Sequence, residues 1–251
     1  MDKKYIITNE TLIYKGHTLY RIKALKSFSC VKEGDLGGWV ESKENLSQND
    51  NCWIADNAKV WSNARVTGNA QVCGNANIWG YALIFENAEV CDNVKIYDDV
   101  RVYGNAKVFH DAILCNEVKV YGNAKIYNKA KLFDYVCVLD NARIYGNTQL
   151  DDTVTVCGNA KVYDEAEVYG DTLIKDNVEV YDNAEIHGNA SLHENVHVCG
   201  FTNICGNVEV YGNCKLNFNK HFIIDGDIII KPLNGNNIIC NKSYYNECYT
   251  H

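Results

Sequence analysis

The most constraining feature of this sequence is a six-residue repeat that runs from Asn51 to Phe218 without an insertion or deletion. All 28 hexads carry Val, Ile or Leu at position four and Ala, Val, Thr or Cys at position two. Every third hexad, from Asn51 through Asn69 to Asn213, also begins with Asn. A fixed short period is typical of solenoids, and a period of 18 residues predicts three hexads per turn. We therefore expect an all-β, triangular parallel β-helix of about nine coils.

The hexad also predicts which side chains face the interior. Because successive side chains of a strand point to opposite faces, positions two and four line the core and positions three and five lie outside. Positions six and one form the corner, where Gly, Asp and Asn tolerate left-handed backbone angles. Stacked Asn side chains at one corner predict a ladder of amide hydrogen bonds. We call the Asn-led hexads the first wall, and the two hexads that follow each of them the second and third walls.

The repeat divides the chain into three parts. Residues 51–218 form the β-helix, and both of its open ends need caps. Residues 1–50 are expected to form an N-terminal cap with a hairpin, in which Thr11–Tyr14 pairs with Thr18–Ala24 around Lys15-Gly16-His17. Residues 219–251 are expected to form a C-terminal cap. Its strands are Phe222–Ile224 and Ile228–Ile230, and the Asn- and Tyr-rich tail closes the end.

Composition narrows the class of protein. The net charge of −8 does not favour a nucleic-acid partner. No apolar stretch is long enough for a signal peptide or a membrane span, so we expect a cytoplasmic protein without a membrane partner. Most of the twelve cysteines occupy hexad positions five or two and no CxxC pair occurs, so we expect reduced, space-filling thiols. The outward histidines show no evident pairing with carboxylates, and we expect no metal site.

The most site-like pattern lies on the first wall. Cations at position three and aromatic residues at position five recur on successive coils of this wall. These residues are Lys107, Phe109, Lys125, Tyr127, Arg143, Tyr145, Lys161 and Tyr163. They could bind an extended anionic or sugar-like polymer through stacking and cation–π contacts. The alternative is that aromatic columns only stabilise neighbouring strands while the lysines provide solubility.

Two motifs carry a resemblance to a known family. The spacing in Val60-x-x-x-Ala64 and Val108-x-x-x-Ala112 resembles the hexapeptide-repeat, left-handed β-helix superfamily. The segment Gly34-Asp35-Leu36-Gly37-Gly38-Trp39-Val40-Glu41, followed by Asn45-Leu46-Ser47, is similar to YdcK-like bacterial and phage proteins, a group generally described as acetyltransferases. This resemblance implies a left-handed helix and a trimer. It also implies an acyl-CoA donor bound in a groove between subunits, with a histidine as general base.

Two functions remain open from the sequence. The repeat contains no extruded loop of the kind that often completes an acyltransferase site. The leading hypothesis is therefore a non-catalytic binding or scaffold protein without a cofactor, which presents flat residue ladders to a macromolecular partner or to itself. The alternative is an acyltransferase that uses acyl-CoA. Outward apolar pairs on the third wall, such as Leu83 with Phe85, predict a homo-oligomer under either hypothesis.

Overall fold

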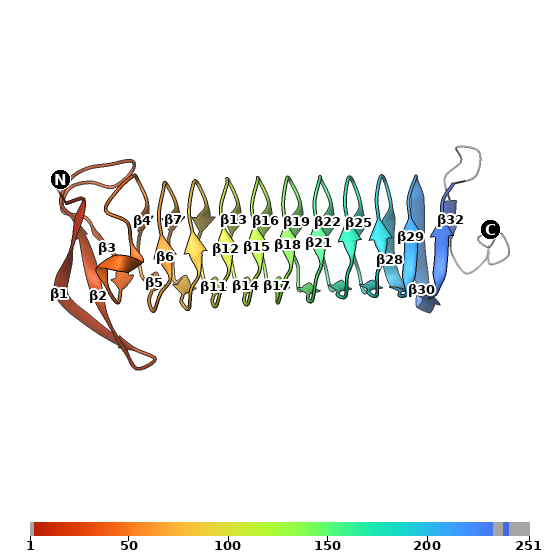
Figure 1. Cartoon of the computed structure of the whole chain (residues 1–251), viewed down its shortest axis with the longest axis horizontal. Helices are drawn as coiled ribbons and strands as arrows, with labels where there is room; N and C mark the ends of the chain where they lie inside the picture. Colours follow the sequence, from red (N-terminus) through yellow and green to blue (C-terminus); the bar gives the residue numbers. More distant parts are fainter. Residues whose placement is uncertain (1–2, 233–237, 241–251) are drawn as a thin grey trace. The chain divides into compact units, whose positions relative to one another are not determined.

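The computed structural model describes residues 3–232 and 238–240, which belong to two compact units, one ending at Asn123 and the other beginning at Ala124. Each unit is a parallel β-solenoid in which every turn contributes three short strands (Figure 1). Strands 18 residues apart pair in register, as Glu89 does with Lys107. The predicted all-β parallel fold is confirmed. No helix in the described part of the chain is long and apolar enough to cross a membrane.

In the first unit, the strands of the solenoid follow the three predicted walls. The first wall contains β4 (Trp53–Ile54), β7 (Gln71–Val72), β10 (Glu89–Val90) and β13 (Lys107–Val108). The second contains β3 (Leu36–Val40), β5 (Lys59–Val60), β8 (Asn77–Ile78), β11 (Lys95–Ile96) and β14 (Ile113–Leu114). The third contains β6 (Arg65–Val66), β9 (Leu83–Ile84), β12 (Arg101–Val102) and β15 (Lys119–Val120).

The second unit repeats the same arrangement. Its first wall contains β16 (Lys125–Ile126), β19 (Arg143–Ile144), β22 (Lys161–Val162), β25 (Glu179–Val180), β28 (His197–Ile204), β30 (Cys214–Ile224) and β32 (Ile238–Cys240). Its second wall contains β17 (Lys131–Leu132), β20 (Gln149–Leu150), β23 (Glu167–Val168), β26 (Glu185–Ile186) and the later halves of β28 and β30. Its third wall contains β18 (Cys137–Val138), β21 (Thr155–Val156), β24 (Leu173–Ile174), β27 (Ser191–Leu192), β29 (Asn207–Val210) and β31 (Asp227–Ile230).

The core and corners follow the hexad as predicted. Side chains at positions two and four, such as Ala124 and Ile126, are completely buried. Position six takes the left-handed backbone conformation at most corners, for example at Asp92 with a φ of 67°. The carboxylate of Asp92 also accepts a hydrogen bond of 2.9 Å from the backbone N–H of His110 on the next coil. Acidic corner residues therefore join neighbouring coils as well as turning the chain.

The predicted amide ladder is present in each unit. In the first unit, the side-chain amide of Asn69 donates to the Asn87 oxygen at 3.0 Å, and Asn87 donates to Asn105 at 3.1 Å. In the second unit, Asn159 donates to Asn177 at 3.1 Å. Because each side-chain amide both donates and accepts, the Asn residues at these exposed corners find their hydrogen-bond partners in the same residue of the neighbouring coils.

The N-terminal hairpin is longer than predicted and covers part of the second wall of the first unit. Strands β1 (Tyr5–Tyr14) and β2 (His17–Ala24) pair antiparallel, and β2 pairs antiparallel with β3. Trp61 was expected outside because it occupies position five, but only 2% of it is exposed. It packs with Leu19 and Trp39, and the ring of Tyr14 meets it edge-on at 5.4 Å. The hairpin thus forms a small additional core on the outer face of the wall.

The solenoid extends beyond the hexads at both ends of the repeat. In the first unit, β3 pairs in parallel with β5, a short 3₁₀ helix (Lys43–Asn45) follows it, and Leu46 bridges to Val66. In the second unit, β31 pairs in parallel with β29. The described residues therefore form about 11 turns rather than about nine, because irregular sequence at both ends adopts the same ladder. The tail predicted to close the C-terminal end lies largely outside the described residues.

The expectation that all cysteines are reduced is wrong for Cys73 and Cys91, which form a disulfide. Both occupy position five of the first wall, 18 residues apart, so the register places their Cα atoms 4.5 Å apart. That separation lies within the range that a disulfide spans. The buried Cys52, Cys199 and Cys214 are reduced thiols, as the space-filling interpretation predicts.

Reducing this disulfide should lower the free energy of unfolding by about 3 kcal/mol, because the bond restricts the unfolded chain across a separation of 18 residues. Urea denaturation with and without dithiothreitol measures the change. A Cys73→Ala/Cys91→Ala variant is the control, since its midpoint should match that of the reduced protein and should not respond to dithiothreitol. An unchanged midpoint after complete reduction would contradict the expectation.

Candidate functional site

The cations predicted on the first wall belong to both units. In the first unit, Lys107 forms an ion pair of 2.7 Å with Glu89 on the preceding coil, so a carboxylate already neutralises its charge. The ring of Phe109 meets His110 edge-on, with 5.0 Å between the ring centroids. The other six predicted residues lie together in the second unit, where they form the feature that we call the tyrosine–cation wall: Lys125, Tyr127, Arg143, Tyr145, Lys161 and Tyr163.

The three cations of the tyrosine–cation wall are direct neighbours. Lys125 pairs in register with Arg143, and Arg143 pairs in register with Lys161, on strands that lie about 4.8 Å apart. Lys161 forms an ion pair of 2.7 Å with Glu179 on the next coil. Within the described residues, Lys125 and Arg143 form no salt bridge, so two adjacent positive charges remain without a carboxylate partner. Like charges directly opposite each other are destabilising, and an anion placed between them would relieve the repulsion.

The tyrosine rings stack on one another. Tyr127 and Tyr145 lie 4.8 Å apart with 2° between their planes, and Tyr145 and Tyr163 lie 4.9 Å apart with the same angle. Tyr181 continues the stack from Tyr163 at 5.0 Å. Because neighbouring rings cover each other's faces, this wall offers ring edges and hydroxyl groups to a ligand. Hydrogen bonding is therefore the contact that these tyrosines can offer a ligand along the wall. The stacked rings themselves have the arrangement expected if aromatic columns stabilise neighbouring strands.

The tyrosine hydroxyls are in the donor form at neutral pH. Partial burial raises the pKa of Tyr127 and of Tyr145. Burial also raises the pKa of Tyr163, with a further contribution from the nearby carboxylate of Glu179. The Tyr163 hydroxyl donates to Glu179 at 3.2 Å, whereas Lys161 holds the other oxygen of the same carboxylate. One end of the wall is thus neutralised, and the end with Lys125 and Arg143 stays cationic.

The structure also contains histidine–carboxylate pairs that the sequence analysis missed. Nε2 of His193 lies 3.1 Å from Oε1 of Glu209, and Nδ1 of His197 lies 3.6 Å from Oε2 of Glu179. His193 and Glu209 are 16 residues apart, as are Tyr163 and Glu179, because a position-five side chain reaches the position-three side chain of the next coil. Searching for polar residues 16 positions apart would have found the first of these pairs.

Three carboxylates in the second unit could offer oxygen ligands to a cation. Oxygen atoms of Asp134, Asp151 and Asp152 lie within 4.8 Å of one another. Burial raises the pKa of Asp151, and the neighbouring Asp134 raises it further. Two of these residues are half-buried and Asp152 is exposed. Acidic groups near the surface are common without an ion, and we assign no metal to them.

Comparisons with known proteins do not assign a function to this chain. No family model matches the chain, and no curated protein matches it. One matching solved structure is that of an Arabidopsis UDP-N-acetylglucosamine acyltransferase, with a TM-score of 0.29 and 17% sequence identity. The alignment covers 67% of this chain and 69% of the other. The predicted resemblance to YdcK-like proteins stays a prediction.

Proposed function

We propose that the protein is a non-catalytic binding module whose tyrosine–cation wall binds an acidic segment of a macromolecular partner. The observation that carries the proposal is the adjacent pair Lys125 and Arg143, which stack in register without a carboxylate between them. Acidic groups of such a segment would lie beside the two adjacent cations. The protonated hydroxyls of Tyr127 and Tyr145 would donate hydrogen bonds beside them.

Removing the two cations tests this proposal. A Lys125→Gln/Arg143→Gln variant should bind a fluorescent oligoglutamate peptide roughly tenfold more weakly in an anisotropy titration at low salt, and binding by the native protein should weaken as salt is added. The matched control is Lys131→Gln/Lys175→Gln, which removes the same charge from the other walls of the second unit. Equal weakening by both double variants would mean that net charge alone attracts the peptide, and would overturn the proposal.

A second candidate function, acyl transfer, is favoured by the pair of His193 and Glu209. A carboxylate that holds an imidazole at 3.1 Å can orient it as a general base towards an acceptor hydroxyl or amine. Calorimetry with acetyl-CoA and transfer assays with a panel of amines and alcohols test this function. Transfer that is lost in a His193→Ala variant would support it. If the native protein shows neither binding of acetyl-CoA nor transfer of an acetyl group, this function is excluded.

A further inference from the structure

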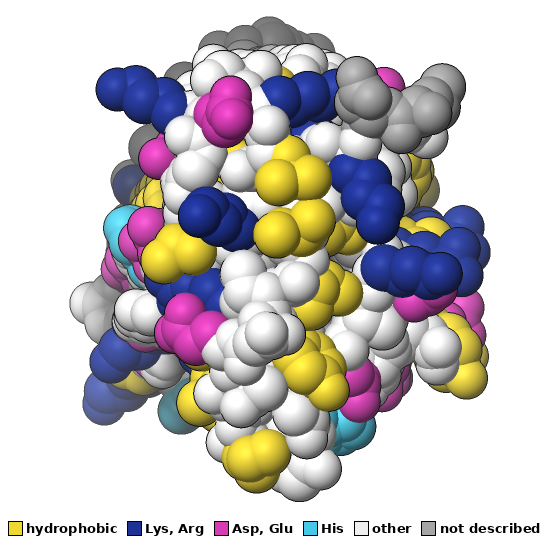
Figure 2. Space-filling model, turned by 90° about the vertical axis from the view of Figure 1, so that its left-hand side faces the viewer, with side chains coloured by type: hydrophobic (Ala, Val, Ile, Leu, Met, Phe, Trp, Pro, Cys, Tyr) yellow, Lys and Arg dark blue, Asp and Glu magenta, His cyan; other side chains and the backbone are white. Residues whose placement is uncertain are grey.

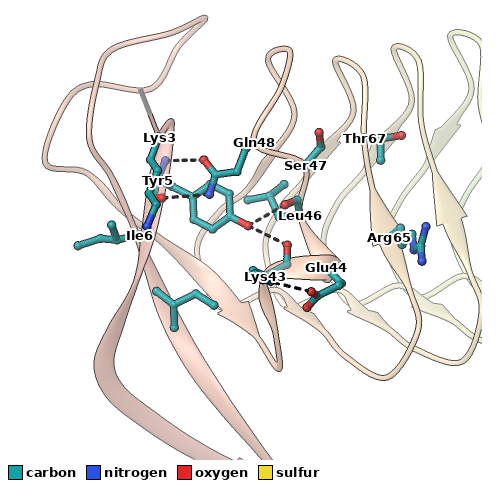
Figure 3. Close-up of a pocket in the computed structure, with 11 residues that line it drawn as sticks. Lys3, Tyr5, Ile6, Lys43, Glu44, Leu46, Ser47, Gln48, Arg65 and Thr67 are labelled. Carbon is teal, nitrogen blue, oxygen red and sulfur yellow. Dashed lines mark hydrogen bonds and ion pairs between the residues drawn. The ribbon is translucent and has the colours of Figure 1, made fainter. Parts of the chain in front are cut away.

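A hollow in the first unit contains no residue of the tyrosine–cation wall and has no role in the function proposed above. It has a volume of about 670 Å³ and opens between β1, the 3₁₀ segment and the first strand of the third wall, β6 (Figure 3). This volume falls within the range of sites for small molecules. Its lining consists of Lys3, Tyr5, Ile6, Ile7, Lys43, Glu44, Leu46, Ser47, Gln48, Arg65 and Thr67.

The lining is positively charged in a chain whose net charge is −8. Among the described lining residues, three are cations, Lys3, Lys43 and Arg65, and one is a carboxylate, Glu44, which lies 3.8 Å from the Lys43 ammonium. A hydrogen bond from Ser42 lowers the pKa of Glu44, and the charges of Lys43 and Arg65 lower it further. Figure 2, which views the hairpin end of this unit, shows Lys and Arg side chains on both sides of a row of hydrophobic side chains.

The walls of the hollow are held in place by hydrogen bonds. The buried Tyr5 hydroxyl donates to the backbone oxygen of Leu46 at 2.7 Å and lies 3.3 Å from that of Lys43. The side-chain amide of Gln48 donates to the backbone oxygen of Tyr5 at 3.1 Å. The segment containing Leu46 is also joined to the third wall, because the N–H of Ser47 donates to Val66 at 3.0 Å. A preformed hollow requires little ordering when a ligand binds.

The chemistry of the lining indicates the class of ligand. The planar guanidinium of Arg65 and the ammonium groups of Lys3 and Lys43 match the oxygens of a phosphate group, and the hydroxyls of Ser47 and Thr67 add hydrogen-bond donors. Ile6, Ile7 and Leu46 supply apolar surface at the same site. We propose that this hollow binds a small organic molecule that carries a phosphate group on an apolar or aromatic body.

Phenyl phosphate is the probe, and amide chemical shifts of isotope-labelled protein are the readout. We expect saturable shifts at Ser47, Gln48 and Thr67 at millimolar probe or below, with weaker binding of inorganic phosphate, which lacks the apolar body. Benzoate distinguishes a general preference for organic anions from a preference for phosphate. Equal affinity for benzoate and phenyl phosphate would overturn the phosphate assignment. The absence of saturable shifts with phenyl phosphate would overturn the site.

Matched variants locate the binding. Arg65→Ala should weaken phenyl phosphate binding about tenfold, since it removes a charged hydrogen-bond donor. Arg101→Ala is the control, because Arg101 occupies the same hexad position on the same wall, two coils further along. Glu44→Gln should tighten binding severalfold by removing the opposing carboxylate, and it remains informative if Arg65→Ala fails to fold. Equal affinities of the Arg65 and Arg101 variants, or weaker binding by Glu44→Gln, would contradict the proposal.

Discussion

Replacing Gly38 with Ala is expected to lower the free energy of unfolding by about 4 kcal/mol. A Cβ atom at this position would lie 2.5 Å from the backbone oxygen of Ala58 and 2.6 Å from Cγ2 of Ile54. The Ala58 oxygen accepts the hydrogen bond from the N–H of Trp39 that joins β3 to β5. The new methyl group must therefore displace the backbone and break the first parallel pairing of the second wall, so both packing and a ladder hydrogen bond are lost.

Chemical denaturation of the Gly38→Ala and Gly16→Ala variants distinguishes the cost of a steric clash from the cost of backbone strain. Gly16, in the hairpin turn, has a φ of 84° and no atom within 4 Å of an added Cβ, so its substitution should cost only about 1 kcal/mol from the left-handed backbone. If the two variants lose the same free energy of unfolding, the close contacts at Gly38 do not add to the cost of the substitution, and the prediction is wrong.

Replacing Lys4 with Met is expected to lower the free energy of unfolding by about 3 kcal/mol, because it leaves backbone carbonyl groups without the charged donor that satisfies them. Only 1% of Lys4 is exposed. Its ammonium donates to the backbone oxygens of Asn49 at 3.0 Å and Cys52 at 2.9 Å, and it lies 3.3 Å from the Cys52 sulfur. Met has a comparable length but no donor, so carbonyl groups at the start of the first coil would lose their partner.

The lower stability should appear as a lower urea midpoint of unfolding and as faster hydrogen exchange of backbone amides in the first coil. Lys23→Met is the matched control, since Lys23 is an exposed residue of β2 and its substitution should change stability by less than about 0.5 kcal/mol. Equal midpoints for the Lys4 and Lys23 variants would show that the ammonium of Lys4 is not required to close the end of the solenoid.

Much of the candidate site could be read from the sequence, because its residues repeat with the coil. The 18-residue period places Lys125, Arg143 and Lys161 in one column, and the structure confirms their register. The period does not show which conformations the side chains adopt on the wall or which neighbours they contact. From the sequence, ring faces that contact a ligand and aromatic columns that only stabilise the strands were both open. The structure shows the rings stacked on one another, and the bond between Tyr163 and Glu179 was not predicted.

The sequence by itself determined the walls, the inward positions and the corners, since these depend on a local period that every coil repeats. Only the tertiary structure decided how the irregular first 50 residues fold onto the repeat. Lys4 and Cys52 are 48 residues apart, and the hollow beside Arg65 is built from β1, the 3₁₀ segment and two coils. Such contacts depend on the path of a single non-repeating segment, and no period in the chain encodes that path.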